Sequence, residues 1–435
     1  MKSSRSDFPE DFLFGVATSS YQIEGHAFGG AGRTHWDDFA ETPGNVARAE
    51  NGAIACDHYH RMDADLDLIR DLGADVYRFS TSWARILPEG RGTVNQEGLD
   101  FYDRLVDGLL VRGIKPAATL YHWELPSPLA DAGGWRNRDI AGWFADFTEI
   151  LMSRIGDRLW SAAPINEPWC VAWLSHFMGL HAPGLRDIRA TARAMHHVLL
   201  AHGRCIQTMR GLGMTNLGAV CNFEWANPAS DSKADRAATE RYDAYYNRFY
   251  LSGIFKGEYP DLVLEGLGRH LPDRWQDDLP TITTPVDWCG LNYYTRKNIA
   301  ATDAPWPALE EVEGPLPKTA MDWEIYPQGI GDFLRRTASE YTGDLPLFVT
   351  ENGMASHSGI NDQDRIDYLD AHLDQVKGAI ADGVPVKGYY VWSLMDNYEW
   401  SLGYDKRFGL IHMDFDSLQR TPKASYHALK AALAR

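Results

Sequence analysis

The chain has 435 residues, of which 44% are hydrophobic, and this is enough apolar material for a large core. Asp and Glu (60) outnumber Lys and Arg (42), and the formal net charge of −18 disfavours nucleic acid as a partner because phosphates would be repelled. No run of about 18 apolar residues is present, so we expect no membrane-spanning helix.

The first residues, MKSSRSDFPEDF, are polar and lack the apolar stretch of a secretory signal, so we predict no signal peptide. The five cysteines are scattered without C-x-x-C spacing, which favours reduced thiols and a cytoplasmic location. Length alone would allow about three domains, but α/β barrels run long as single units. No Gly/Ser-rich or Pro-rich linker divides the chain, and we expect residues 1–435 to form one domain.

Strand-like and helix-like segments alternate along the chain. The strand candidates are residues 12–20, 74–83, 115–123, 160–168, 217–223, 287–294, 347–353 and 386–394. Amphipathic helix patterns occupy residues 57–73, 98–113, 139–155 and 361–381, with apolar side chains at three- and four-residue steps. A Pro- and Glu-rich run at 304–318 is expected to be a long loop near the cleft entrance.

Eight strand–helix units predict an α/β fold, a parallel sheet closed into a (β/α)8 barrel with long loops after the strands. An open doubly wound sheet is the alternative, but the Gly-rich phosphate turn expected after an early strand is absent from the sequence. Functional side chains of a barrel gather where its strands end. The candidate strand ends carry Gln22, Arg78, His122, Asn166, Glu167, Asn222, Asn292, Tyr294, Glu351 and Trp392.

Two of these strand-like runs end in a glutamate beside an asparagine, at Glu167 and Glu351. Each glutamate alone could equally pair with an arginine or cap a helix. Two carboxyl groups that face each other raise one pKa, so that one stays protonated while the other is ionised. Glycoside hydrolysis requires this division into an acid and a nucleophile or base.

Seven ordered segments resemble the family 1 glycoside hydrolases, chiefly β-glucosidases, which are TIM barrels. They are FLFGVATSSYQIEG (12–25), YHWELP (121–126), INEP (165–168), GLHAPG (179–184), LNYY (291–294), LFVTENGMA (347–355) and DNYEWSLGYDKRFG (396–409). The resemblance implies a retaining, exo-acting β-glycosidase that removes terminal β-D-glucosyl residues and tolerates β-galactosides or β-fucosides. It implies small-molecule β-glycosides or short oligosaccharides as partners.

By the same resemblance, Glu167 is the acid/base and Glu351 the nucleophile, with carboxyl groups about 5–5.5 Å apart. Arg78 and Tyr294 would support the nucleophile, because a nearby cation lowers the pKa of a carboxylate. The implied sugar-binding set is Gln22, His122, Asn166, Asn292, Tyr294, Trp392, Glu399 and Trp400. The implied outer cleft is lined by Trp123, Trp169, Trp173, Phe177, His181 and Trp323.

A carboxylate at position 399 would repel a sugar phosphate, which favours an unphosphorylated substrate. We predict no metal and no cofactor, because the H-x-H pair of His58 and His60 falls in a helix, where positions i and i+2 face apart. A transglycosylating β-glycosidase and a non-catalytic sugar-binding protein on the same scaffold stay open as alternatives, as does a homo-oligomer. The intact pair of carboxylates argues against the binding protein.

Overall fold

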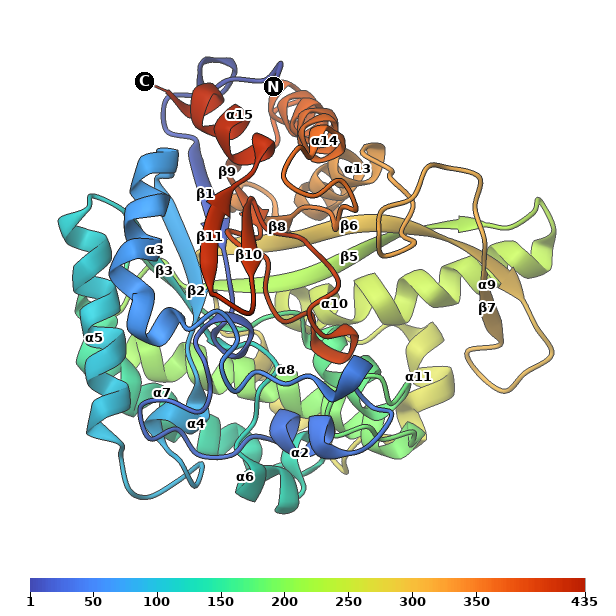
Figure 1. Ribbon diagram of the computed structural model, residues 1–435. Helices are drawn as coiled ribbons and strands as arrows, with labels where there is room; N and C mark the ends of the chain where they lie inside the picture. Colours follow the sequence, from blue (N-terminus) through green and yellow to red (C-terminus); the bar gives the residue numbers. More distant parts are fainter. Residues whose placement is uncertain (435) are drawn as a thin grey trace.

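The computed structural model describes residues 1–434 (Figure 1). Its eight parallel strands are β1 (Leu13–Ala17), β2 (Val76–Ser80), β3 (Lys115–Tyr121), β4 (Ser161–Ile165), β5 (Gly218–Pro228), β6 (Trp288–Ala301), β8 (Leu347–Asn352) and β9 (Val386–Trp392). They pair in the order β4-β3-β2-β1-β9-β8-β6-β5. Parallel bridges from Ala162 to Leu217 and from Asn166 to Val220 join β4 to β5. The predicted (β/α)8 barrel is therefore confirmed.

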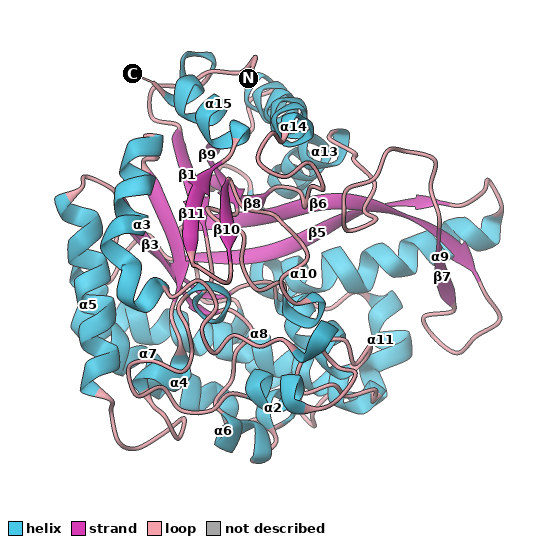
Figure 2. Ribbon diagram, viewed as in Figure 1, coloured by secondary structure: helices cyan, strands magenta, loops and turns pink. Residues whose placement is uncertain are grey.

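Figure 2 shows the strands at the centre of the molecule with helices around them. The longer helices are α3 (His58–Leu72), α5 (Gln96–Val111), α7 (Ile140–Ile155), α8 (Ile188–Gly211), α9 (Lys233–Asp243), α10 (Phe249–Lys256), α13 (Gln328–Thr337), α14 (Gln363–Ala381) and α15 (Ala424–Leu433). Shorter ones are α1 (Ser20–Ile23), α2 (His35–Glu41), α4 (Trp83–Ile86), α6 (Ser127–Asp131), α11 (Asp261–Leu267) and α12 (Leu279–Ile282). Within residues 1–434, no helix is long and apolar enough to cross a membrane.

The helix α3 shows how the sequence pattern becomes structure. Its residues Met62, Leu66, Ile69 and Leu72 recur on one face and are all buried. Gly73 then ends the helix with φ +82°, a left-handed conformation that glycine adopts at little cost. The helix docks through its apolar face, and its end is set by a residue that the sequence already marked.

Strands β5 and β6 continue well beyond their predicted ends at residues 223 and 294. The last part of β6 also pairs in antiparallel fashion with β7 (Leu309–Val312). The prediction of a loop over 304–318 is therefore wrong for residues 309–312. Pairing with β6 stabilises this exposed acidic segment as a strand. A hairpin of β10 (Ile411–Asp414) and β11 (Gln419–Pro422) was likewise not predicted. Figure 1 shows the extended β5, β6 and β7 reaching out to the right of the barrel, and we name this part the arm.

Alternation along the strands prepares the site. Val76, Val220 and Tyr390 belong to one buried cluster that fills the lower barrel. Because side chains in a strand alternate between faces, residues two positions further on also point inward but lie closer to the carboxyl end. These residues are Arg78, Asn222 and Trp392. The apolar floor and the polar mouth are thus successive layers of the same strands.

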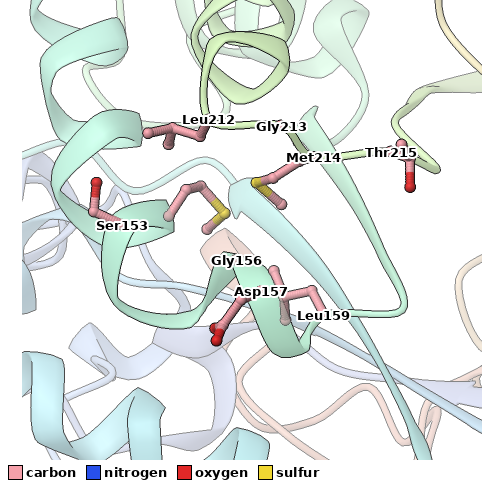
Figure 3. A pocket seen from close by; sticks show the side chains of 9 residues that line it. Ser153, Gly156, Asp157, Leu159, Leu212, Gly213, Met214 and Thr215 are labelled. Atoms are coloured by element: carbon pink, nitrogen blue, oxygen red, sulfur yellow. The ribbon is translucent and has the colours of Figure 1, made fainter.

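A surface cavity of about 490 Å³ lies elsewhere (Figure 3). It is lined by the end of α7 and by residues 212–215, which precede β5. These segments lead into the amino ends of β4 and β5, so the cavity lies at the opposite end of the barrel from the strand ends discussed next.

Candidate active site

Glu351, at the end of β8, is buried and receives two side-chain hydrogen bonds from other strands. Arg78 on β2 donates from Nη1 to Oε1 at 2.5 Å, and the Tyr294 hydroxyl on β6 donates to Oε2 at 2.7 Å. The second guanidinium nitrogen of Arg78 donates to Asn166 Oδ1 at 2.7 Å. One cation therefore connects the end of β8 to the end of β4.

Glu167, which follows β4, is also buried but has only neutral direct partners. Asn292 Nδ2 donates to its Oε1 at 2.6 Å, and the Cys170 thiol lies 3.1 Å from its Oε2. The same Asn292 nitrogen donates to Asn166 Oδ1 at 3.0 Å, and the Thr350 hydroxyl donates to Asn292 Oδ1 at 2.6 Å. The two glutamates thus stand in one connected network with different charges beside them.

The two environments affect the carboxyl pKa values differently. Burial, followed by the Glu351 charge, raises the pKa of Glu167 to about 8, which leaves this carboxyl protonated at neutral pH. Burial also raises the pKa of Glu351, while Arg78 and then Tyr294 lower it. The cation opposes the effect of burial at Glu351 without cancelling it, whereas Glu167 lacks a directly bonded cation.

Aromatic rings form one wall beside these groups. The His122 ring lies nearly parallel to Trp392 at 5.5 Å and to Trp400 at 6.2 Å between centroids. His122 Nε2 is 3.2 Å from Asn166 Nδ2, and Trp123 Nε1 donates to the Asn166 carbonyl at 2.9 Å. Burial and Arg78 lower the pKa of His122 well below its ordinary value, so the imidazole is neutral.

Gln22 is bonded to the loop 396–400, which carries both Glu399 and Trp400. Gln22 Nε2 donates to Asn397 Oδ1 and to the Tyr398 carbonyl, at 3.0 and 2.7 Å. Burial, followed by the charges of Glu351 and Glu167, raises the pKa of Glu399 to about 8. The Oε2 atom of Glu399 is buried and has no hydrogen-bond partner among the described residues.

The residues predicted to line the outer cleft separate into two groups. Trp323 is half-buried and lies 5.5 Å from Tyr294, and Trp123 is half-buried and lies 5.1 Å from Trp400 and 5.2 Å from His181. Both tryptophans are next to the glutamate network.

Trp169 and Trp173 stack with each other and are both buried; Trp173 retains only 2% exposure. Trp173 packs between Tyr245 and the half-buried Phe177, at 4.2 and 4.5 Å. The structure therefore places Trp173 in the core and not on an open cleft wall. Asn222, another predicted strand-end group, donates to the Tyr246 hydroxyl at 2.9 Å.

Three residues of the site adopt left-handed backbone conformations. Glu167, Trp123 and Trp400 have φ values of +50°, +74° and +53°. Side chains other than glycine rarely adopt this region, and such strain tends to collect at functional sites. No sequence signal marks these three positions.

Two further contacts were not foreseen, those of Cys170 and Thr350. Cys170 is three residues after Glu167 at the start of a helical turn, and this i, i+3 spacing could have indicated the contact. The predicted separation of His58 from His60 is confirmed, because His58 contacts Asp65 and His60 contacts Asp57. In the described part of the chain, no three His, Cys, Asp or Glu side chains are grouped to hold a metal ion.

Comparisons with known proteins agree with this geometry. Residues 4–434 match the model of glycosyl hydrolase family 1. The chain is 47% identical to β-glucosidase A of Thermotoga maritima over 96% of both chains, and 40% identical to a bifunctional β-D-glucosidase/β-D-fucosidase of Bifidobacterium breve over 96% of both. A solved structure of the family 1 β-glucosidase from Thermotoga maritima in complex with isofagomine lactam superimposes with a TM-score of 0.95 at 44% identity, covering 99% of this chain and 98% of that one. The two buried glutamates, the barrel that carries them and this near-complete match identify the chain as a member of glycosyl hydrolase family 1.

Proposed function

We propose that this chain is an O-glycosyl hydrolase, a retaining exo-β-glycosidase that removes terminal β-D-glucosyl residues from small glycosides or short oligosaccharides. The observation that carries the proposal is the pair of buried carboxyl groups at the ends of β4 and β8, one bonded to a cation and one to neutral groups. The names of the relatives support glucosides as substrates.

In the first step, a Glu351 oxygen attacks the anomeric carbon while Glu167 protonates the glycosidic oxygen. The bond between that carbon and oxygen breaks, the alcohol leaves with the Glu167 proton, and a covalent glycosyl ester forms on Glu351. The contacts of Arg78 and Tyr294 support this role for Glu351, because both donate to the ionised form.

In the second step, ester formation has removed the charge of Glu351. Since that charge raises the pKa of Glu167, its removal lowers this pKa and favours the carboxylate. Glu167 then takes a proton from water, the water oxygen attacks the anomeric carbon, and the bond to Glu351 breaks. The sugar leaves as the β-anomer and both carboxyl groups return to their starting states.

The remaining polar groups fit a sugar ring. The buried Oε2 of Glu399 has no hydrogen-bond partner among residues 1–434, and a sugar hydroxyl would supply one. We assign the 2-hydroxyl to Asn166, whose Oδ1 is already held by Arg78 and Asn292. His122, Gln22 and the indoles Trp392 and Trp400 complete this set. Because burial raises the pKa of Glu399 to about 8, its carboxyl is largely neutral at pH 7, and the repulsion of a sugar phosphate expected from the sequence applies only to its ionised form.

Substrate tolerance and the outer cleft are part of the proposal. The bifunctional relative supports side activity on β-fucosides. Trp123 and Trp323, half-buried beside the network, are our candidates for contacts with the leaving group. A core that extends from Phe8 to Leu433 supports one catalytic domain, and five free, buried thiols support a cytoplasmic location.

The direct test is release of nitrophenol from nitrophenyl β-glucoside, with Glu351→Gln as the control. We expect release by the unmodified chain only, and NMR of early product should show the β-anomer. Early α-anomer would show inversion and would refute Glu351 as the nucleophile. Failure to cleave any of several β-glycosides would favour a sugar-binding protein, and glycosides formed from an added alcohol in place of free sugar would favour a transglycosylase.

A further inference from the structure

Cys170 touches the candidate acid/base directly. Its Sγ lies 3.1 Å from Glu167 Oε2, and the exposed fractions of the two residues are 6% and 4%. The amide of Val171 donates to the Glu167 carbonyl at 3.3 Å, so Glu167 immediately precedes the helical turn that begins at Pro168 and carries Cys170. The turn Cys170–Leu174 is π-helical, a local irregularity that often accompanies function.

The amide of Asn292 indicates which oxygen of Glu167 carries the proton. Its Oδ1 accepts from the Thr350 hydroxyl, and its Nδ2 faces two acceptors, Asn166 Oδ1 and Glu167 Oε1. The reversed amide would place an oxygen against those two oxygens, so the network fixes the orientation. Glu167 Oε1 therefore accepts a hydrogen bond, and the acid proton belongs on Oε2, the oxygen beside the thiol.

We infer that Cys170 is a positioning residue for the acid/base, held by a hydrogen bond that reverses direction as Glu167 gains and loses its proton. This inference rests on the proposed function. A thiol is both a weak donor and a weak acceptor. The protonated Oε2–H can donate to Sγ, and once the leaving group has taken that proton, Sγ–H can donate to the carboxylate.

A weak hydrogen-bond acceptor such as the Cys170 thiol suits the Glu167 proton, because this proton must be transferred to the leaving group. The Oε2–H group has to turn from Sγ towards the glycosidic oxygen, and a sulfur acceptor holds it less firmly than an oxygen would. The thiol keeps its own proton, because burial and the charge of Glu167 raise the pKa of Cys170 well above its ordinary value. The bond to the carboxylate form is charge-assisted, and so it outweighs the bond to the acid form.

Other titratable groups around this contact belong to several elements. Those that influence Glu167 or Cys170, or respond to them, are Arg78, Cys221, Glu224, Tyr246, Tyr250, Tyr294, Glu351 and Glu399. Of these, Glu351 is the strongest influence on Glu167 after burial. The experiment must therefore separate the effect of the Cys170 thiol on the pKa of Glu167 from the effect of Glu351. It does so by following the alkaline and the acidic limb of the pH–activity profile separately.

The test compares Cys170→Ala and Cys170→Ser with Cys221→Ala, which removes a buried thiol on β5. Among the described residues, Cys221 has no hydrogen bond to either glutamate. The quantity measured is kcat/KM against pH for an alkyl β-glucoside, whose leaving group needs the acid. Loss of the donor should move the alkaline limb upward by roughly 0.5–1 pH unit in Cys170→Ala. The stronger hydroxyl donor should move it downward in Cys170→Ser. Cys221→Ala and the acidic limb should not move.

A second substrate separates positioning from packing. Dinitrophenyl β-glucoside needs little acid assistance, so its kcat/KM should change little in either Cys170 variant. Equal losses on both substrates at every pH, or alkaline limbs that coincide with the unmodified enzyme, would overturn the inference. If Cys170→Ala melts below the assay temperature, Cys170→Val takes its place. An unmodified chain that cleaves neither substrate would instead refute the proposed function.

Discussion

The ends of β4 and β8 present the same chemical group in two different surroundings. At β8, Glu351 is bonded to a guanidinium and a phenol; at β4, Glu167 is bonded to an amide and a thiol. Both are buried almost completely, so exposure does not distinguish them. The difference lies in the charge of the partner, and we propose that this charge makes Glu351 the nucleophile and Glu167 the acid.

Removing Glu351, the proposed nucleophile, should give the largest effect. We expect Glu351→Gln to lower kcat by at least about 10⁴-fold on every substrate, because no covalent intermediate can form. Steady-state hydrolysis of aryl and alkyl β-glucosides measures this. A variant that retained activity on dinitrophenyl β-glucoside would contradict the assignment.

Glu167→Gln should show a loss that depends on the leaving group. General acid assistance contributes about 10²–10⁴-fold, so an alkyl β-glucoside should lose that much in kcat/KM while dinitrophenyl β-glucoside loses far less. In the unmodified enzyme, kcat/KM for the alkyl substrate should fall as pH rises through about 8, where Glu167 loses its proton. Equal losses on the two substrates would mean that the two glutamates do not differ in role.

Tyr294→Phe should weaken only the β8 environment. Loss of one hydrogen bond to a carboxylate should lower kcat/KM by about 10-fold or somewhat more. Because the Tyr294 hydroxyl lowers the pKa of Glu351, its removal should raise that pKa and move the acidic limb of the pH profile upward. The alkaline limb serves as the internal control, and a shift there instead would assign Tyr294 to Glu167.

The smallest expected effect concerns Glu124, a carboxyl outside the pair, and it is an effect on thermal stability. Burial raises the pKa of Glu124, in the loop after β3, to about 8. Its folded pKa exceeds the ordinary 4.5, so its contribution to stability is complete below about pH 4.5 and is lost as pH rises to about 8. Glu124→Gln avoids this loss. The difference in Tm between Glu124→Gln and the unmodified chain should therefore shift in favour of the variant as pH rises from 5 to 9. A Tm difference that does not change with pH would contradict the conclusion that burial raises the pKa of Glu124.

Periodicity and strand-terminal residues were sufficient to predict the barrel and the convergence of Glu167, Glu351, Arg78 and Tyr294 at one end. These features are local or follow from the geometry of parallel strands. The burial of Trp173 could not be predicted, because it depends on Tyr245, some 70 residues further along the chain. β7 was missed for a similar reason, since its exposed residues form a strand only by pairing with the extended β6.

The arm has a mechanical consequence. Strand β6 runs from Trp288 to Ala301, so Asn292 and Tyr294 lie on the same strand as residues 298–301, which pair with β7. A displacement of the outer half of β6 would therefore act on the strand that carries these two hydrogen-bond donors to Glu167 and Glu351. Since Asn292 and Tyr294 belong both to the glutamate network and to the proposed sugar-binding set, we expect a change in the length of the turn between β6 and β7 to alter catalysis and sugar binding together.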